Sequence, residues 1–157
     1  MRPRSATLLS KYREFQFMLL HGIIYTKEQL LRFGFVENNL CLFCNQEIET
    51  YKHLFLSCQK VNDIWKEMIE YYDLFEIRNM NWDDIHVGLC GNSARVKFVN
   101  SLIIFMKYVI FKSRNAGKLL TFNEFGKKLL EYMEEEKKIA SRRGKLVLHL
   151  LKWEYAN

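Results

Sequence analysis

Apolar residues recur at three- and four-residue spacing along most of the chain, which is the pattern of one buried face of an α-helix. The first such stretch contains Leu8, Tyr12, Phe15 and Leu19 and meets no breaker before Gly22. A second amphipathic stretch follows at 61–72, with apolar residues at Val61, Ile64, Trp65, Met68, Ile69 and Tyr72. Both stretches are predicted to be helices.

Capping signals predict where the remaining helices begin and end. Thr26 and Gln29 have the spacing of a capping box, so a short helix should begin there and stop at Gly34. Thr50 and Asn81 are candidate N-caps of two further short helices, and Thr121 is the candidate cap of a long one. The most apolar helix is predicted over 94–115, and a short last helix over 145–153.

The predicted fold class is therefore all-α. A single proline and seven glycines in 157 residues favour long helices over a strand-and-turn architecture. We expect two regions, a helical domain over 8–75 that contains three of the four cysteines and a helical C-terminal region over 81–155.

Composition narrows the class of protein. A hydrophobic content of 49% is ample for a buried core. The longest apolar run, 102–111, is interrupted by Lys107 and is too short to span a bilayer, which needs about 20 apolar residues. No apolar run of signal-peptide length follows the basic N-terminus. We expect an intracellular protein with no membrane partner, in a compartment where clustered thiols indicate metal more often than disulfide.

The net charge of +6 is unevenly distributed. Segment 37–84 carries four basic and ten acidic residues, whereas segment 85–123 carries six basic and no acidic residue. Any nucleic-acid contact is therefore expected on the basic segments before and after the cysteines and not on the cysteine segment itself.

Three of the four cysteines and one histidine lie in the stretch CLFCNQEIETYKHLFLSC, with the spacing C-x2-C-x8-H-x4-C. The residues are Cys41, Cys44, His53 and Cys58. Three thiolates and one imidazole match a closed, tetrahedral structural zinc site, in which no position is left for substrate. Because His53 and Cys58 are five residues apart, the helix that carries them is expected to end or distort near Ser57. The alternative is a set of ordinary buried cysteines beside a core histidine.

The residues around this site resemble a known family. The run from Phe15 to Cys58 has a helix ending in Leu-His, a Thr-led helix, the CxxC pair and the closing run Glu-Thr-x-x-His-Leu-Phe-x-x-Cys, with Trp65 a few residues later. It is similar to the zinc-binding domain found downstream of the reverse transcriptase in non-LTR (LINE-type) retrotransposon polyproteins. The later run MKYVIFKSRNAGKLLTFNEF resembles the helical C-terminal end of such polyproteins.

This resemblance implies structural Zn²⁺ and a module that works beside the rest of a reverse-transcriptase polyprotein. Its partner would be RNA or DNA, during target-primed reverse transcription in the nucleus or in a cytoplasmic ribonucleoprotein. The chain has no Tyr/Phe-x-Asp-Asp run and no endonuclease signature, so polymerase and nuclease activity are not carried over. No nucleophile and base arrangement suggests another enzyme or a small-molecule substrate.

Basic residues on two predicted helices are the candidates for contact with nucleic acid. At 100° per residue Lys107, Arg114 and Lys118 fall within about 40° of each other, with Tyr108 and Phe111 beside them. Aromatic rings next to cations suit a single strand, but the same two rings are equally consistent with a place in the core. The predicted contacts are Lys11, Arg13, Arg95, Lys97, Lys107, Lys112, Arg114 and Lys118.

Several neighbouring residues are assigned structural roles. Cys90 has no partner at ligand spacing and is expected to be a buried thiol. The run 134–136, three glutamates followed by two lysines, is expected on a solvated helix face.

A second function remains open beside nucleic-acid binding, namely a helical scaffold that contacts only protein.

Overall fold

The computed structural model of the protein describes residues 6–157. In that range the regular secondary structure is entirely helical. One isolated bridge joins Leu40 and Ile48. The prediction of an all-α fold is confirmed. In chain order the helices are α1 (Ser10–Leu20), α2 (Lys27–Arg32), the π-helix η2 (His53–Ser57), α3 (Gln59–Tyr71), the 3₁₀ turn η3 (Phe75–Ile77), α4 (Trp82–Val87), α5 (Ala94–Ala116), α6 (Phe122–Arg142), α7 (Leu146–Trp153) and the 3₁₀ turn η4 (Glu154–Ala156).

The predicted capping residues begin the helices. The Thr26 and Thr121 side chains accept from backbone amides three residues later, and both capping boxes are complete. Asn81 caps α4 through the amide of Asp83. Gly117 ends α5 in the left-handed conformation, with φ of 76°, where a residue with a side chain would be strained. Local sequence therefore determines where α2, α4 and α6 begin and where α5 ends.

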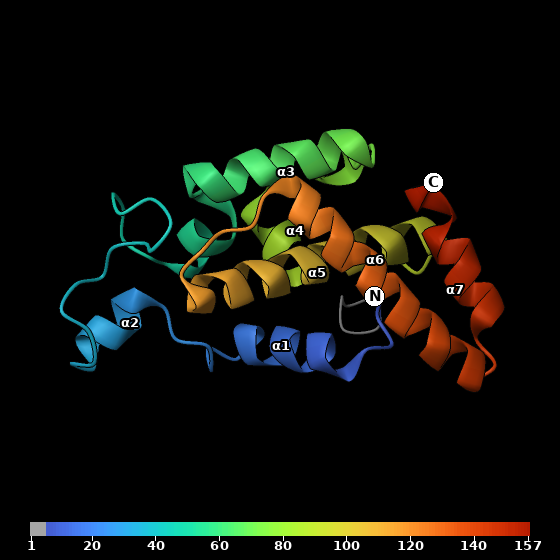
Figure 1. Ribbon diagram of the computed structural model, residues 1–157, viewed down its shortest axis with the longest axis horizontal. Coiled ribbons are helices and arrows are strands. Elements are labelled where there is room, and N and C mark those ends of the chain that lie inside the picture. The colour runs from blue at the N-terminus through green and yellow to red at the C-terminus, as the bar shows by residue number, and fades with distance from the viewer. Residues whose placement is uncertain (1–5) are drawn as a thin grey trace.

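Helix α5 lies in the middle of the molecule, with α1 along one side and α3 along the other (Figure 1). It packs against α1, η2, α6 and α7. Because it is covered on several sides, it buries residues all round its circumference over 98–110, except for the half-buried Tyr108. One hydrophobic cluster includes side chains from both regions predicted from the sequence, and the boundary between those regions stays a prediction.

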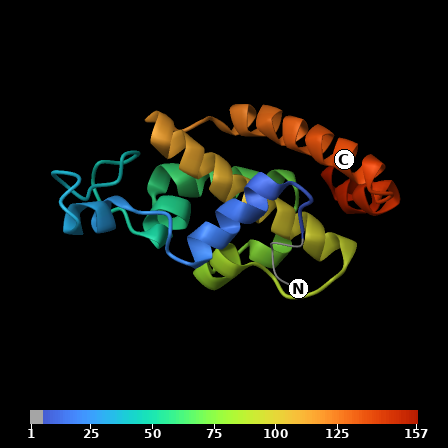
Figure 2. The same ribbon diagram turned by 90° about the horizontal axis from the view of Figure 1, so that it is seen from below.

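The two ends of the molecule are built differently. Helix α2 and the loop that follows it form one end, and the α6–α7 hairpin forms the other, as the view from below also shows (Figure 2). At the hairpin end the carboxylate of Glu136 is fully buried and accepts hydrogen bonds from Lys152 Nζ at 2.6 Å, Trp153 Nε1 at 2.8 Å and the amide of Leu8 at 3.0 Å. The prediction that Glu136 lies on a solvated face is wrong, since α7 folds back over it.

No helix in the described part of the chain combines the length and the apolar character needed to cross a membrane.

Candidate metal centre and basic groove

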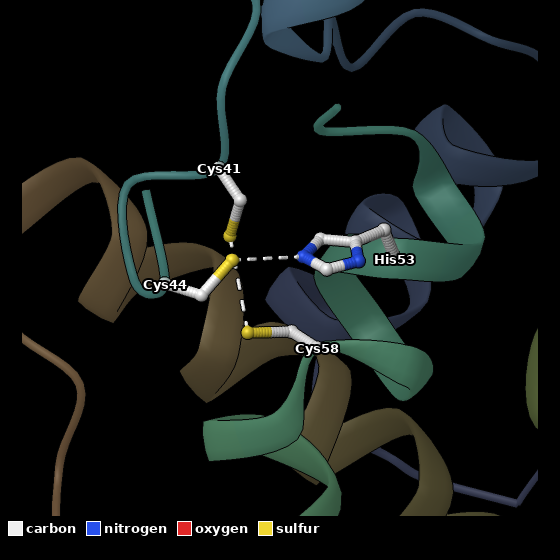
Figure 3. Close-up of side chains that lie close together, drawn as sticks. All are labelled: Cys41, Cys44, His53 and Cys58. Atoms are coloured by element: carbon white, nitrogen blue, oxygen red, sulfur yellow. Dashed lines mark hydrogen bonds between the residues drawn. The ribbon is translucent and has the colours of Figure 1, made fainter. Parts of the chain in front are cut away.

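Four side chains from two segments converge where the loop after α2 meets η2 and the start of α3 (Figure 3). Cys41 and Cys44 come from the loop, His53 opens η2, and Cys58 directly precedes α3. The three sulfur atoms and one ring nitrogen lie within 4.8 Å of one another. The predicted ligand set is therefore brought together by the fold.

The loop is shaped by its own backbone hydrogen bonds. The amide of Asn45 donates to the carbonyl of Cys41 at 2.8 Å, and the amide of Cys41 donates to the carbonyl of Glu47 at 2.8 Å. Asn45 has a positive φ of 54°, which asparagine tolerates better than most residues. This tight turn directs both cysteine side chains to the same side.

A π-helix accommodates the sequence spacing of the other two ligands, His53 and Cys58. His53 and Cys58 are five residues apart, and the amide of Cys58 donates to the carbonyl of His53 at 2.8 Å, the i→i+5 bond of a π-turn. The hydroxyl of Thr50 accepts from the amide of His53 and starts this turn. The predicted distortion near Ser57 is confirmed.

The distances fit a tetrahedral ion. Zinc bonds of about 2.3 Å to sulfur and about 2.0 Å to nitrogen require ligand atoms about 3.5 to 3.8 Å apart. Cys41 Sγ lies 3.9 Å from Cys58 Sγ, and Cys44 Sγ lies 3.4 Å from His53 Nε2. All four cysteines of the chain are free thiols, so no disulfide competes for these donors. The group can hold one metal ion with little movement.

The surroundings favour the charged form of one thiol and place a carboxylate near the histidine. The Cys41 thiol donates to Cys58 and lowers the pKa of Cys58; burial opposes this, and backbone amides of Lys60 and Val61 at the start of α3 lower the pKa further. His53 turns Nε2 toward the sulfurs, and its buried Nδ1 lies 3.3 Å from the Glu47 carboxylate, close but poorly aligned for a hydrogen bond. A carboxylate behind a ligating histidine is a common outer partner at metal sites.

Comparison with known families agrees with this geometry. Residues 5–65 match the family described as zinc-binding in reverse transcriptase. This part of the chain is similar to that family. Searches of curated proteins and of solved structures gave no significant match. The family is one of zinc-binding domains and not of catalytic ones.

The zinc-binding domain packs against α5, which lies outside the matched residues. Glu49, fully buried, accepts from Arg114 of α5 at 2.6 Å and from the amide of Lys27 at the start of α2 at 2.9 Å. Arg114 also donates to the carbonyl of Tyr25. Glu49 therefore connects the segment between Cys44 and His53 to α2 and to the end of α5.

Three of the predicted nucleic-acid contacts have other structural roles. The prediction that Lys107 lies on an exposed basic line is wrong, because its ammonium is fully buried and donates to Gln16 Oε1 at 2.6 Å and to the carbonyl of His86 at 2.9 Å. Arg114 is engaged by Glu49 and Arg95 by Glu76, each pair at 2.6 Å. Tyr108 and Phe111 both pack against Phe15 in the core cluster.

Three other predicted residues meet in one groove of about 630 Å³ between α1, α5 and α6. Its charged side chains are Lys11, Lys112, Lys118, Lys128, Glu131 and Glu135, and Tyr108 forms part of its lining. Arg13 and Lys97 lie outside it, in other surface depressions. Whether any of these residues touches nucleic acid stays a prediction.

Lys128, Glu131 and Glu135 were not predicted from the sequence. Their spacing of three and four residues places them on one face of the 122–142 helix, and this periodicity was readable. Cys90 is exposed, so the prediction that it is a buried thiol is wrong.

Proposed function

We propose that the chain is a non-catalytic module of a non-LTR retrotransposon reverse-transcriptase polyprotein, and that it binds RNA or DNA during target-primed reverse transcription. The observation that supports this best is the groove, which gathers Lys11, Lys112, Lys118 and Lys128. Ammonium groups along a groove pair with phosphates and release counterions, the main source of affinity for nucleic acid. Such a module works in the nucleus or in a cytoplasmic ribonucleoprotein.

We assign Zn²⁺ to the Cys41, Cys44, His53 and Cys58 group, in a structural role. The closed donor set leaves no open position for a reacting water. The site supports binding indirectly: Glu49, between Cys44 and His53, holds Arg114 of α5. Arg114 lies between the groove residues Lys112, near the end of α5, and Lys118, just beyond it, so order at the metal site supports the position of both.

Salt-titrated fluorescence anisotropy with labelled RNA and DNA oligonucleotides tests the proposal. Affinity should fall as salt rises, with a log–log slope of about −0.7 per neutralised phosphate on a single strand. The triple variant Lys112→Gln, Lys118→Gln, Lys128→Gln should bind more weakly and reduce the slope by up to about 2. The control, Lys60→Gln, Lys66→Gln, Lys138→Gln, removes the same charge from exposed positions outside the groove. Absence of binding at low salt, or equal losses in both triples, contradicts the proposal.

A protein-binding scaffold is the second candidate function. Large apolar side chains are exposed around α2, among them Ile23 at 50%, Tyr25 at 48%, Phe33 at 53% and Phe35 at 76%. Exposed apolar groups of this kind mark protein contacts. Substituting Phe33 and Phe35 with serine should leave nucleic-acid affinity unchanged if the groove is the nucleic-acid site. A large loss would place the binding surface on α2.

A further inference from the structure

The basic and the acidic side chains of the groove lie mostly toward its opposite ends. Lys118 lies 3.6 Å from Glu124 in the first turn of α6, and Lys128 follows one turn later. Glu131 and Glu135 continue along the same helix, so Glu135 lies about 10 Å beyond Lys128 at 1.5 Å per residue. One end of the groove therefore carries Lys112, Lys118 and Lys128, and the other carries two carboxylates with Lys11.

The acidic end is accessible to a ligand. Lys11 Nζ lies 2.9 Å from Glu135 Oε2, and both side chains are 48% exposed. An ion pair this exposed contributes little stability and can be exchanged for contacts with a ligand. Tyr12 and Tyr108 both line the groove and pack against each other, with ring centroids 4.5 Å apart, and Tyr108 is only half-buried.

A duplex does not match this arrangement. Its outer surface presents phosphates at every step, so a duplex along the groove sets phosphates against Glu131 and Glu135 as well as against the lysines. Like charges in contact lose affinity. A single strand is different, because its unstacked bases turn N–H donors away from its phosphates. Carboxylates accept only, and the amino group of cytosine is a recognised partner of glutamate.

We propose that the groove selects single-stranded nucleic acid, with phosphates on Lys112, Lys118 and Lys128 and base N–H groups on Glu131 and Glu135. This inference rests on the proposed function and adds its substrate class. The lysines supply affinity, and the two carboxylates discriminate against the duplex.

The test compares three labelled probes of equal length on the full chain: a cytosine-rich single strand, its duplex, and an abasic single strand that keeps the phosphates but lacks bases. The single strand should bind at least about tenfold more tightly than the duplex. The abasic strand should bind more weakly than the cytosine-rich strand. The variant Glu131→Gln, Glu135→Gln should gain affinity for the duplex and bring the single-strand preference down to about threefold or less.

The double variant Glu67→Gln, Glu134→Gln is the matched control, because it removes the same two charges from exposed positions outside the groove. It should leave the ratio of the three affinities unchanged. Equal binding of single strand and duplex by the wild type overturns the inference while the proposed function stands. An equal gain for all three probes in the Glu131→Gln, Glu135→Gln variant also overturns it, since that result is general charge repulsion. If the wild type binds none of the probes, the proposed function itself is wrong.

Discussion

The two ends of the molecule hold their buried polar groups by opposite means. At the α2 end, Cys41, Cys44, His53 and Cys58 gather four ligand atoms that can hold a metal ion from outside the chain. At the hairpin end, Glu136 is equally buried, but Lys152 of α7 supplies its counter-charge at 2.6 Å. A bound metal ion would complete one end, whereas the chain itself completes the other.

This difference decides what each end responds to. We expect metal availability to control the first end, because thiolates packed together without a cation repel one another. The pH controls the hairpin end, because a buried carboxylate and its ammonium partner stay paired until one of them changes protonation.

Loss of the metal should have the largest effect. Zinc binding by small structural sites contributes an apparent 10 to 16 kcal/mol, and 1 kcal/mol shifts the melting temperature of a chain of this size by about 2 to 4 °C. Removing zinc with a chelator, or substituting Cys58→Ser, should therefore lower the melting temperature by at least about 20 °C. Zinc content by elemental analysis and thermal melting check this. Cys90→Ser is the control, since Cys90 is exposed and outside the site. A protein purified without zinc, or one whose melting ignores the chelator, contradicts the assignment.

Substituting Glu136→Gln tests the hairpin end. The change leaves the buried ammonium of Lys152 without its carboxylate, which costs about 3 to 5 kcal/mol. Denaturant unfolding measures the loss, and metal content should not change. Glu134→Gln, two positions earlier on an exposed part of α6, should lie within about 0.5 kcal/mol of wild type. A comparable loss in both variants means that the pair with Lys152 is not the cause.

The same cluster predicts an acid dependence. Burial alone raises the pKa of Glu136, but His149 at 3.3 Å, the charge of Lys152 and hydrogen bonds from Lys152 and Trp153 outweigh it and hold this pKa at about 2. The folded carboxylate therefore stays ionised while the unfolded one takes up a proton. Its contribution is complete above pH 4.5, the ordinary value, and is lost as the pH falls toward 2. The stability difference between wild type and Glu136→Gln should shrink over this range, and a constant difference contradicts the assignment.

Lys107 differs from the buried groups at both ends of the molecule, because it is a buried cation with neither a metal ion nor a carboxylate against it. Burial lowers its pKa to about 7, so the unfolded chain holds its proton more tightly than the folded one. Stability from this group therefore rises with pH between about 7 and 10.5, by about 3 to 4 kcal/mol up to pH 10. Lys107→Met should remove that rise. The exposed Lys112→Met on the same helix should keep it, and a rise in all three proteins contradicts the assignment to Lys107.

Local signals explain what the sequence could reveal. Thr26 with Gln29 and Thr121 with Glu124 are three residues apart, and both capping boxes form as predicted. The ligands of the metal group span only residues 41 to 58, so their spacing carries most of the information about the site. The predicted distortion of the helix between His53 and Cys58 follows from the same short-range geometry.

The errors concern contacts between distant parts of the chain. Lys107 was placed on an exposed face because the periodicity of α5 cannot reveal that α1 and α4 cover it through Gln16 and His86. Glu136 was placed in a solvated run because its partners, Lys152 and Leu8, are 16 and 128 residues away. Charge patterns along one helix do not say which helix lies above it.

Substitution of Glu47 should have the smallest effect, and it tests whether a residue outside the ligand set supports His53. Its carboxylate lies 3.3 Å from His53 Nδ1, but the side chain is 70% exposed, so water can replace it at little cost. Outer partners of ligating histidines typically change metal affinity by about 10- to 100-fold when removed. For Glu47→Gln we expect at most about the lower value, because this partner is exposed and poorly aligned. Competition titration with a zinc chelator measures it, with Glu37→Gln as a control on the same loop. A hundredfold loss would mean that Glu47 orients His53 in the metal-bound protein, and that this end of the molecule, like the other, depends on a carboxylate of its own.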